Sequence, residues 1–382
     1  MIVYLSMILW VLLVYFFYSS THRTQMISDE NSNHQFSAEL DKKIPILVCL
    51  LVFGYFIFWI GLRGDLADTG TDIWTFNNIP TSFPDAWNRI NWDGRGPGYE
   101  MLAVLFKSFI SKDANAWLMT IAIISGCCIV IGLRRYSCDF FYSSYLFITL
   151  LIFYWMINGM RQFLCVAIVF AFSHWIEKGK IVRLIVLALL LYFIHITALV
   201  IIPLYFVARG KPWTIKTFAF ILIIAVITLF SEPFFKNAET VFGRVAYQGY
   251  TDQFHVDDGV NVLRVLFTAV FPALALWKRH ELEKHYEDTP VIPICINMSL
   301  VTTAIFFVGM FTSGILVGRM PIYSEVFNML LIPYLLKYGF SESEQRILRP
   351  FITIILFVFF YLKLPHYYHS DILNITSYEI FG

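Results

Sequence analysis

Charged residues are scarce: Asp, Glu, Lys and Arg make up 14% of the 382 residues, whereas they make up about 25% of a typical soluble domain. This scarcity excludes an ordinary soluble enzyme and a disordered chain. The formal net charge of +1 also lacks the basic excess that binds nucleic acid, so no nucleic-acid partner is expected. Hydrophobic residues instead make up 58% of the sequence and lie in long runs. The composition therefore predicts a polytopic membrane protein.

Familiar catalytic signatures are missing as well. The sequence contains no phosphate-binding loop, no zinc signature, no nucleophile elbow and no dinucleotide fingerprint. Its six cysteines lie in or beside apolar runs and lack the spacing of metal ligands. We therefore expect neither a metal nor another cofactor.

Ten stretches are apolar and long enough to cross a bilayer, since a spanning helix needs about 20 mostly apolar residues. They lie near 2–18, 44–62, 115–133, 140–158, 162–177, 214–231, 261–277, 291–310, 321–337 and 348–363. Two more stretches are ambiguous, because 98–110 is short and charged and 184–208 is interrupted by His195 and Pro203. We predict an all-α polytopic integral membrane protein of about 11–12 transmembrane helices plus re-entrant segments. It forms a single membrane domain over residues 1–382, with one long outer loop at 63–97.

The distribution of basic residues favours one topology. If 98–110 does not cross, and 184–208 is a re-entrant pair of half-helices turning near His195, every cluster of Lys and Arg faces the cytoplasm. If both stretches crossed fully, Arg134 and Arg135 would face outward. A re-entrant backbone is tolerated only where protein or a watery cavity surrounds it, so the favoured topology implies an internal cavity. The outer segments are then the loops 63–97 and 232–260, the turns 158–161 and 311–320, the bend at His195 and the tail 364–382.

Single arginines remain on the outer side, at helix ends from four distant parts of the chain: Arg63, Arg161, Arg264 and Arg319. An arginine at membrane depth costs about 2.5–3.5 kcal/mol on insertion scales, and guanidinium suits bidentate binding of phosphate. Arg161 begins an apolar helix with Gln162, where a cation opposes the helix dipole unless it shares an anion with the first-turn amides. Ion pairs with Glu325 or Asp257 are the alternative. We predict one outward pocket for a polyanionic, lipid-embedded substrate.

Three residues are candidates for a catalytic base. His195 has about 11 apolar residues on either side, and an ionisable residue at membrane depth is a functional candidate by default. It could act as a base or donate to phosphate, or it could be a neutral ring bonded to a backbone carbonyl. Asp72 and Glu100 lie in or beside the polar outer loop. Trp74, in the same loop, is either an interfacial belt residue or a platform on which a sugar stacks.

At these residues the chain resembles the Wzy-type O-antigen and capsule polymerases, and more closely their EpsG-like branch. The motifs that carry the resemblance are Arg63 followed by Gly70-Thr71-Asp72-Ile73-Trp74, Pro97-Gly98-Tyr99-Glu100, Arg161-Gln162, Ile194-His195-Ile196-Thr197-Ala198, Asn261-x-x-Arg264 and Arg319-x-x-x-Tyr323. Ile194 stands where the family usually has an aromatic residue, and Ile73-Trp74 replaces a polar residue and Tyr in many members.

The resemblance implies a metal-independent glycosyltransferase of the bacterial inner membrane whose active site faces outward. It would join undecaprenyl-diphosphate-linked oligosaccharide repeat units, as donor and acceptor, into a polysaccharide, with a chain-length regulator and a flippase as partners. His195, Asp72 or Glu100 would be the catalytic base. The substrate-binding residues would be Arg63, Arg161, Gln162, Asn261, Arg264, Arg319, Tyr323 and Trp74. A lipid-linked oligosaccharide flippase and an O-antigen ligase are the alternatives.

Overall fold

The structure is a computed structural model that describes residues 2–28, 44–64, 68–92, 96–229, 259–312 and 317–367. All regular secondary structure in these ranges is helical. Most of the predicted outer loop 232–260, together with Asp257, lies outside the described residues, and so does the end of the tail 364–382.

Four of the described helices are long and apolar enough to cross a membrane: α1 (Ile2–Ser28), α7 (Ala114–Tyr136), α18 (Val291–Gly309) and α21 (Glu342–Tyr367). Shorter apolar helices accompany them: α3 (Ile46–Gly61), α9 (Met160–Ala171), α11 (Ile181–Tyr192), α12 (Ile201–Ala208), α13 (Ile215–Leu229) and α16 (Val262–Trp277). These helices confirm the prediction of an all-α, polytopic membrane protein.

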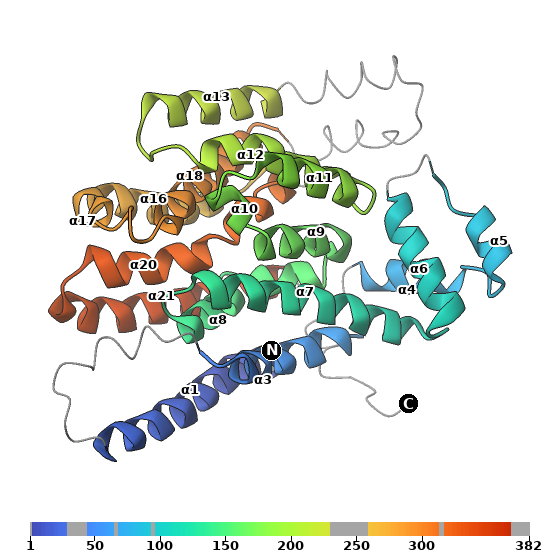
Figure 1. The fold of residues 1–382 in the computed structure, drawn as a ribbon, viewed down its shortest axis with the longest axis horizontal. Helices are drawn as coiled ribbons and strands as arrows, with labels where there is room; N and C mark the ends of the chain where they lie inside the picture. The colour runs from blue at the N-terminus through green and yellow to red at the C-terminus, as the bar shows by residue number, and fades with distance from the viewer. Residues whose placement is uncertain are drawn as a thin grey trace.

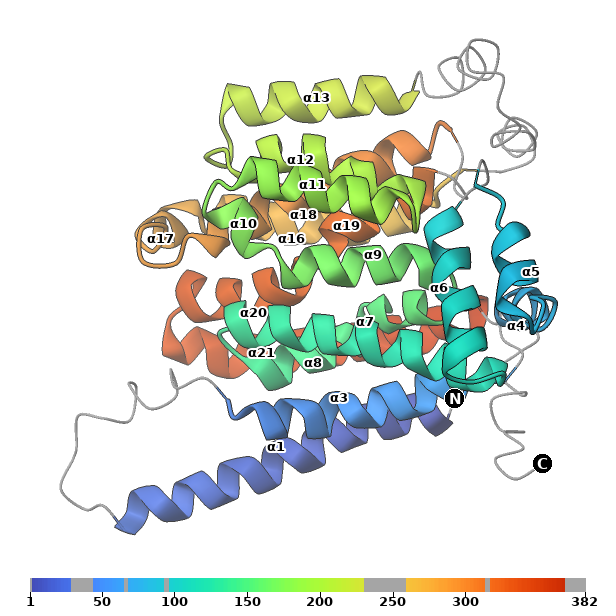
Figure 2. The same ribbon diagram turned by 45° about the vertical axis from the view of Figure 1, so that its right-hand side comes forward.

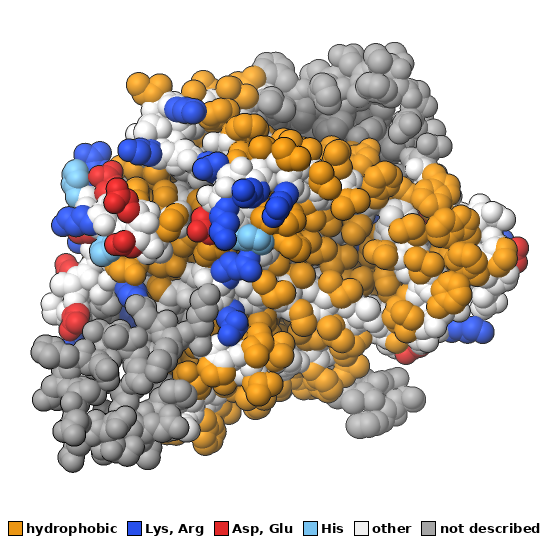
Figure 3. Space-filling view, in the orientation of Figure 1, with side chains coloured by type: hydrophobic (Ala, Val, Ile, Leu, Met, Phe, Trp, Pro, Cys, Tyr) orange, Lys and Arg blue, Asp and Glu red, His pale blue; other side chains and the backbone are white. Residues whose placement is uncertain are grey.

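Most of these helices lie side by side along one common direction, which is horizontal in Figures 1 and 2. Helix α7 packs against α3 and α9, and α18 contacts α12, α13, α16 and α20 (Asn328–Gly339). The core between them is strongly aromatic and includes the fully buried Phe53, Phe147, Phe163 and Phe170. The face shown in Figure 3 is broadly hydrophobic, as lipid contact requires.

The predicted span 140–158 is not one continuous helix. Helix α8 (Phe140–Thr149) ends before Leu151, whose φ of 60° is left-handed. A short 3-10 helix, η1 (Ile152–Met156), and Gly159, with φ of 82°, follow before α9 begins. Helix α8 therefore ends, and helix α9 begins, inside the protein. The unpaired backbone groups of such ends need polar partners or a cavity, so this break prepares a place for a site.

Helix α6 (Pro97–Phe109) runs across the common direction in both views, and it forms a cap with α4 (Thr69–Asn77) and α5 (Phe83–Asn88) (Figures 1 and 2). This orientation supports the interpretation that 98–110 does not cross. Helix α11 turns back at His195 into η2 (Ile196–Val200) and α12, which pack against α11. The turn meets the cap, because the Gly98 amide donates to the Phe193 carbonyl at 2.8 Å.

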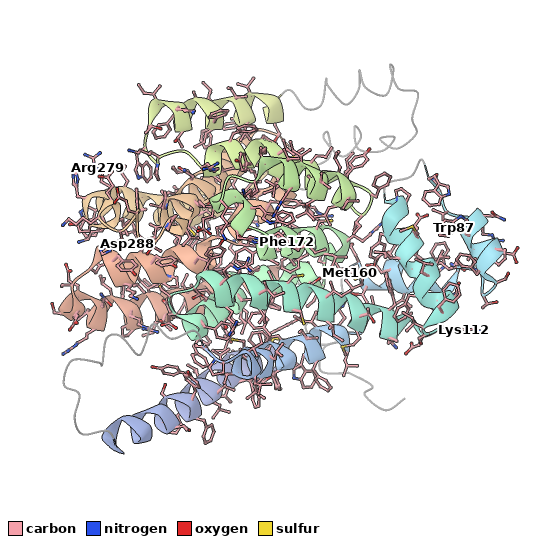
Figure 4. The ribbon with its side chains drawn as sticks, viewed as in Figure 1. Trp87, Lys112, Met160, Phe172, Arg279 and Asp288 are labelled. Atoms are coloured by element: carbon pink, nitrogen blue, oxygen red, sulfur yellow. The ribbon has the colours of Figure 1, made fainter. Side chains whose placement is uncertain are left out.

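The cap and the opposite end of the protein differ in charge. Trp87 and Lys112 lie at the cap, whereas Arg279 and Asp288 lie at the other end (Figure 4). Charged side chains gather at that other end, around α17 (Arg279–Glu283) (Figures 1 and 3). Since loops rich in Lys and Arg face the cytoplasm, the α4–α6 cap is expected to face outward.

This orientation can be tested with two exposed positions, Asp85 in α5 and Lys284 just after α17. In intact cells a membrane-impermeant maleimide should label Asp85→Cys, whereas Lys284→Cys should be labelled only after permeabilisation. The unsubstituted chain is the control for its six native thiols, three of which are buried. Labelling of Lys284→Cys in intact cells would contradict the proposed topology.

Candidate functional site

Arg63 is buried, with only 2% of its surface exposed, and it joins three segments. Its Nε donates to Thr69 Oγ1 at 2.9 Å, its Nη1 to the Ile60 carbonyl at 2.9 Å, and its Nη2 lies 3.1 Å from Met160 Sδ. These contacts link the end of α3, the first residue of α4 and the first residue of α9. Arg63 lines neither cavity described below, which supports a structural part for it instead of the predicted contact with substrate.

The first turn of α9 directs two neighbouring side chains to different places. Gly159, with φ of 82°, lets the chain turn into the helix, where a Cβ would be strained. Arg161 is exposed, and its guanidinium lies 5.6 Å from the centre of the Tyr99 ring. Gln162 is 3% exposed, and its Nε2 donates to the Arg319 carbonyl at 3.0 Å. The Arg161-Gln162 pair therefore lies between the cap and the segment that carries Arg319.

A cavity of about 260 Å³ opens between α4, α5 and α6, and we name it the cap cavity. The polar and aromatic side chains that line it include Asp72, Trp74, Arg89, Glu100, Trp117 and Arg161. Trp74 is 68% exposed at this cavity, so its ring is available to a ligand. Aromatic faces next to carboxylates and amides suit the binding of a polar molecule with apolar ring faces, such as a sugar.

A second cavity of about 340 Å³ lies beside the break between α8 and α9, and we name it the α16 cavity. Its polar lining includes Asn158, Asn261, Arg264, Arg319, Glu325 and Lys363. Leu150, Leu151, Phe267 and Phe359 also line it, and the rings of Phe267 and Phe359 stack with centres 3.8 Å apart. The cavity thus combines a cationic region with an apolar wall.

The cations of the α16 cavity outnumber its acidic groups. Among the described residues that line it, three are positive, namely Arg264, Arg319 and Lys363, and one, Glu325, is acidic. Arg264 Nη2 lies 3.7 Å from Glu325 Oε2, and its guanidinium lies 4.2 Å from the centre of the Phe306 ring. The ion pair that the sequence allowed between Arg264 and Glu325 is therefore present. The remaining positive charge suits an anionic ligand.

The sequence led us to expect that the four arginines line one common pocket, but they do not share one. Arg161 lines the cap cavity, Arg264 and Arg319 line the α16 cavity, and Arg63 is buried. The physical reason is that the guanidinium of Arg63 donates to acceptors inside the protein. The first turn of α9 separates Arg161 from Arg264 and Arg319. The two cavities are neighbours, because Gln162, which follows Arg161 of the cap cavity, donates to the carbonyl of Arg319 in the α16 cavity.

His195 contacts Thr197 and lines neither cavity. The Thr197 amide N–H donates to His195 Nδ1 at 3.4 Å. Thr197 Oγ1 lies 2.7 Å from Nδ1 and 3.2 Å from the Tyr323 hydroxyl. Tyr323 is 1% exposed and lines neither cavity, so its contacts indicate that it orients His195 through Thr197.

Two more predicted residues have structural contacts. The Glu100 Oε2 atom accepts a hydrogen bond from the Asn91 amide at 3.1 Å and thereby holds the segment after α5. The Asn261 side chain accepts a hydrogen bond from the Leu263 amide at 2.8 Å and caps the start of α16. Both residues nevertheless line a cavity, Glu100 the cap cavity and Asn261 the α16 cavity.

Asp72 is the carboxylate best suited to act as a base. It lies half-buried in the first turn of α4 and lines the cap cavity with Arg161. Burial raises the pKa of Asp72 from 3.8 to about 6, and the positive charges of Arg161 and Arg63 offset only part of this rise. A general base works best when its pKa lies near the working pH.

Lys363 and Arg89 line the two cavities although they were not among the predicted site residues. Lys363 lies at the outer end of the last predicted span, where a lone lysine runs against the positive-inside rule, and this signal was available in the sequence. Arg89 lies in a polar loop, where nothing in the sequence separates it from the other exposed arginines.

Comparison with known families decides the relationship of the chain. The model of the EpsG family matches residues 46–380, which is most of the sequence. The chain belongs to the EpsG family. EpsG membership links this multi-pass membrane protein to exopolysaccharide biosynthesis. No curated protein and no solved structure matches the chain, so in this EpsG protein the candidate site is assigned from its own geometry.

The raised pKa of Asp72 in this EpsG protein can be measured directly. Infrared difference spectra, with Asp72→Asn used to assign the carboxyl signal, should show a midpoint at about pH 6. Arg161→Gln should raise the midpoint, because it removes the largest stabilising positive charge. Since the folded state holds this proton more tightly than the unfolded state, the contribution of Asp72 to the free energy of unfolding should fall as the pH rises from about 4 to 6.

Arg89→Gln is the matched control, since Arg89 lines the same cavity but is exposed and does not shift the pKa of Asp72. An unsubstituted protein in which Asp72 titrates near pH 4 would contradict the burial argument.

Proposed function

We propose that this EpsG protein is a polysaccharide polymerase. It joins undecaprenyl-diphosphate-linked oligosaccharide repeat units by metal-independent glycosyl transfer at the outer face of the bacterial inner membrane. A flippase would supply the repeat units, and a chain-length regulator would act with it. The observation that carries the proposal is the pair of neighbouring cavities on either side of Arg161-Gln162, one with a candidate base and one with an excess of cations.

The α16 cavity suits the diphosphate of a lipid-linked donor. Arg264, Arg319 and Lys363 offer positive charge, and Asn158 and Asn261 add polar groups. The apolar wall around the stacked Phe267 and Phe359 rings can take the start of an isoprenoid chain. A diphosphate joined to a hydrocarbon needs this combination of charge and apolar surface.

The cap cavity suits the sugar end of the acceptor. Asp72 accepts the proton of the attacking hydroxyl, whose oxygen forms a bond to the anomeric carbon of the donor. The bond between that carbon and the diphosphate oxygen breaks, and the electron pair leaves with the diphosphate. Positive side chains stabilise the negative charge that develops on this leaving group.

Reconstitution with a lipid-linked repeat unit tests the proposal. The purified protein in liposomes should produce a ladder of polymers on a gel, whereas a flippase would only move the substrate and a ligase would require a different acceptor. Arg319→Gln and Lys363→Gln should each lower kcat/KM, by as much as ~10²–10³-fold, the loss typical of one donor to a developing oxyanion.

The matched control is Arg346→Gln, which removes an exposed positive charge in the first part of α21, outside both cavities. It should leave the ladder unchanged. If Arg319→Gln and Lys363→Gln both formed long polymers at the unsubstituted rate, the α16 cavity would not be the diphosphate site.

The rate should also depend on pH through Asp72. Because the active base is the ionised carboxylate, kcat/KM should rise with pH and level off above the pKa of about 6. The fall of kcat/KM below this pKa is the acid limb of the profile. Asp72→Asn should abolish both the activity and this acid limb, whereas Glu100→Gln should retain the limb. An acid limb that persists in Asp72→Asn would assign the base to another residue.

A further inference from the structure

Helix α4, which carries Asp72, is held at its C-terminal end by a buried lysine from α6. Lys107 is 6% exposed, and its Nζ donates to the carbonyls of Phe76 and Asn77, both at 2.8 Å. Phe76 and Asn77 are the last two residues of α4. The carbonyls at a helix C-terminus have no partner within the helix and carry partial negative charge, so a cation there is well placed.

The N-terminal end of α4 is held by a second buried cation. Arg63 Nε donates to the side chain of Thr69, the first residue of α4, and Arg63 is also bonded to the end of α3. A helix of nine residues is too short to be stable alone in water, where about 12–15 residues are needed. Its place therefore depends on these two contacts and on the packing of Phe76 against Trp117, whose rings stack with centres 6.0 Å apart.

The burial of Lys107 is costly, since the described residues include no acidic partner within ion-pair distance of its Nζ. Two carbonyl oxygens and the face of the Phe76 ring, 5.3 Å from Nζ to its centre, compensate its charge. An apolar side chain of similar length would fill the same space but would leave both carbonyls without this donor. The ammonium group adds two directional hydrogen bonds, which determine where the end of α4 lies.

We propose that Lys107 and Arg63 are positioning residues, which fix the two ends of α4 and thereby hold Asp72 in place beside Arg161. Asp72 faces Arg63 and Arg161 as positive groups and Asp68 as a negative one, and Glu100 and Arg89 line the same cavity. A displacement of α4 changes the separation of Asp72 and Arg161, and with it the proton affinity of the carboxylate. The effect on catalysis rests on the proposed function, whereas the effect on α4 does not.

Two measurements on the full-length protein test the proposal. In Lys107→Met, hydrogen exchange of the α4 amides should accelerate at least tenfold, while exchange in α7 should stay unchanged. In the polymerase assay, kcat/KM of Lys107→Met should fall. The pH at which its kcat/KM reaches half of the plateau should also differ from that of the unsubstituted protein. Lys107→Arg, which keeps a cation and several donors, should restore most of the protection.

Lys112→Met is the matched control, because Lys112 is an exposed lysine just after α6 and lies at the surface of the cap (Figure 4). It should change neither exchange nor the pH profile. If Lys107→Met is not recovered as folded protein, Lys107→Gln, which keeps a neutral donor, takes its place. The same changes in exchange, kcat/KM and pH profile are expected, with a smaller size.

Unchanged exchange in α4 of the Lys107 variant would overturn the proposal. The proposal would also fail if the folded variant had the same kcat/KM, and the same dependence of kcat/KM on pH, as the unsubstituted protein. If the unsubstituted protein forms no polymer, the proposed function fails, but the exchange data still decide whether Lys107 fixes α4.

Discussion

The hydrogen bond from the Gln162 side chain to the Arg319 carbonyl joins two parts of the chain that are 157 residues apart. It connects the first turn of α9 to η4 (Val317–Arg319), the short turn that precedes the last helices. Because Gln162 is buried, this bond is protected from water and places Arg161 and Arg319 on either side of one junction. Arg161 lines the cap cavity and Arg319 lines the α16 cavity, so the bond lies where the two cavities meet.

The fold was largely predictable because lipid imposes a simple rule on composition. Runs such as 115–133 and 291–310 have to be helical, since backbone groups in hydrocarbon need partners within their own segment. The same rule could not predict the break at Leu151 and Gly159. There the protein itself surrounds the backbone, and an apolar run such as 140–158 reads the same with or without a break.

The candidate site was predictable residue by residue but not as an arrangement. Asp72, Arg161, Arg264 and Arg319 all line cavities, because charge near membrane depth is costly and is placed for a reason. Sequence cannot tell whether a buried arginine turns toward a ligand or toward the protein, and Arg63 turns toward the protein. Direction depends on acceptors such as Thr69 and Ile60, whose position only the folded chain determines.

The size of the α16 cavity limits what the protein can sense. Under the proposed function, a cavity of about 340 Å³, at the small end of pockets that enclose drug-sized molecules, would surround only the head of a lipid-linked glycan. The remaining sugars would extend into water and the isoprenoid tail into the bilayer. The cavity would then contact the same atoms in every round of elongation, whatever the number of sugars already joined. Such a polymerase would not measure the length of its product in this cavity, and that length would be decided by dissociation or by another protein.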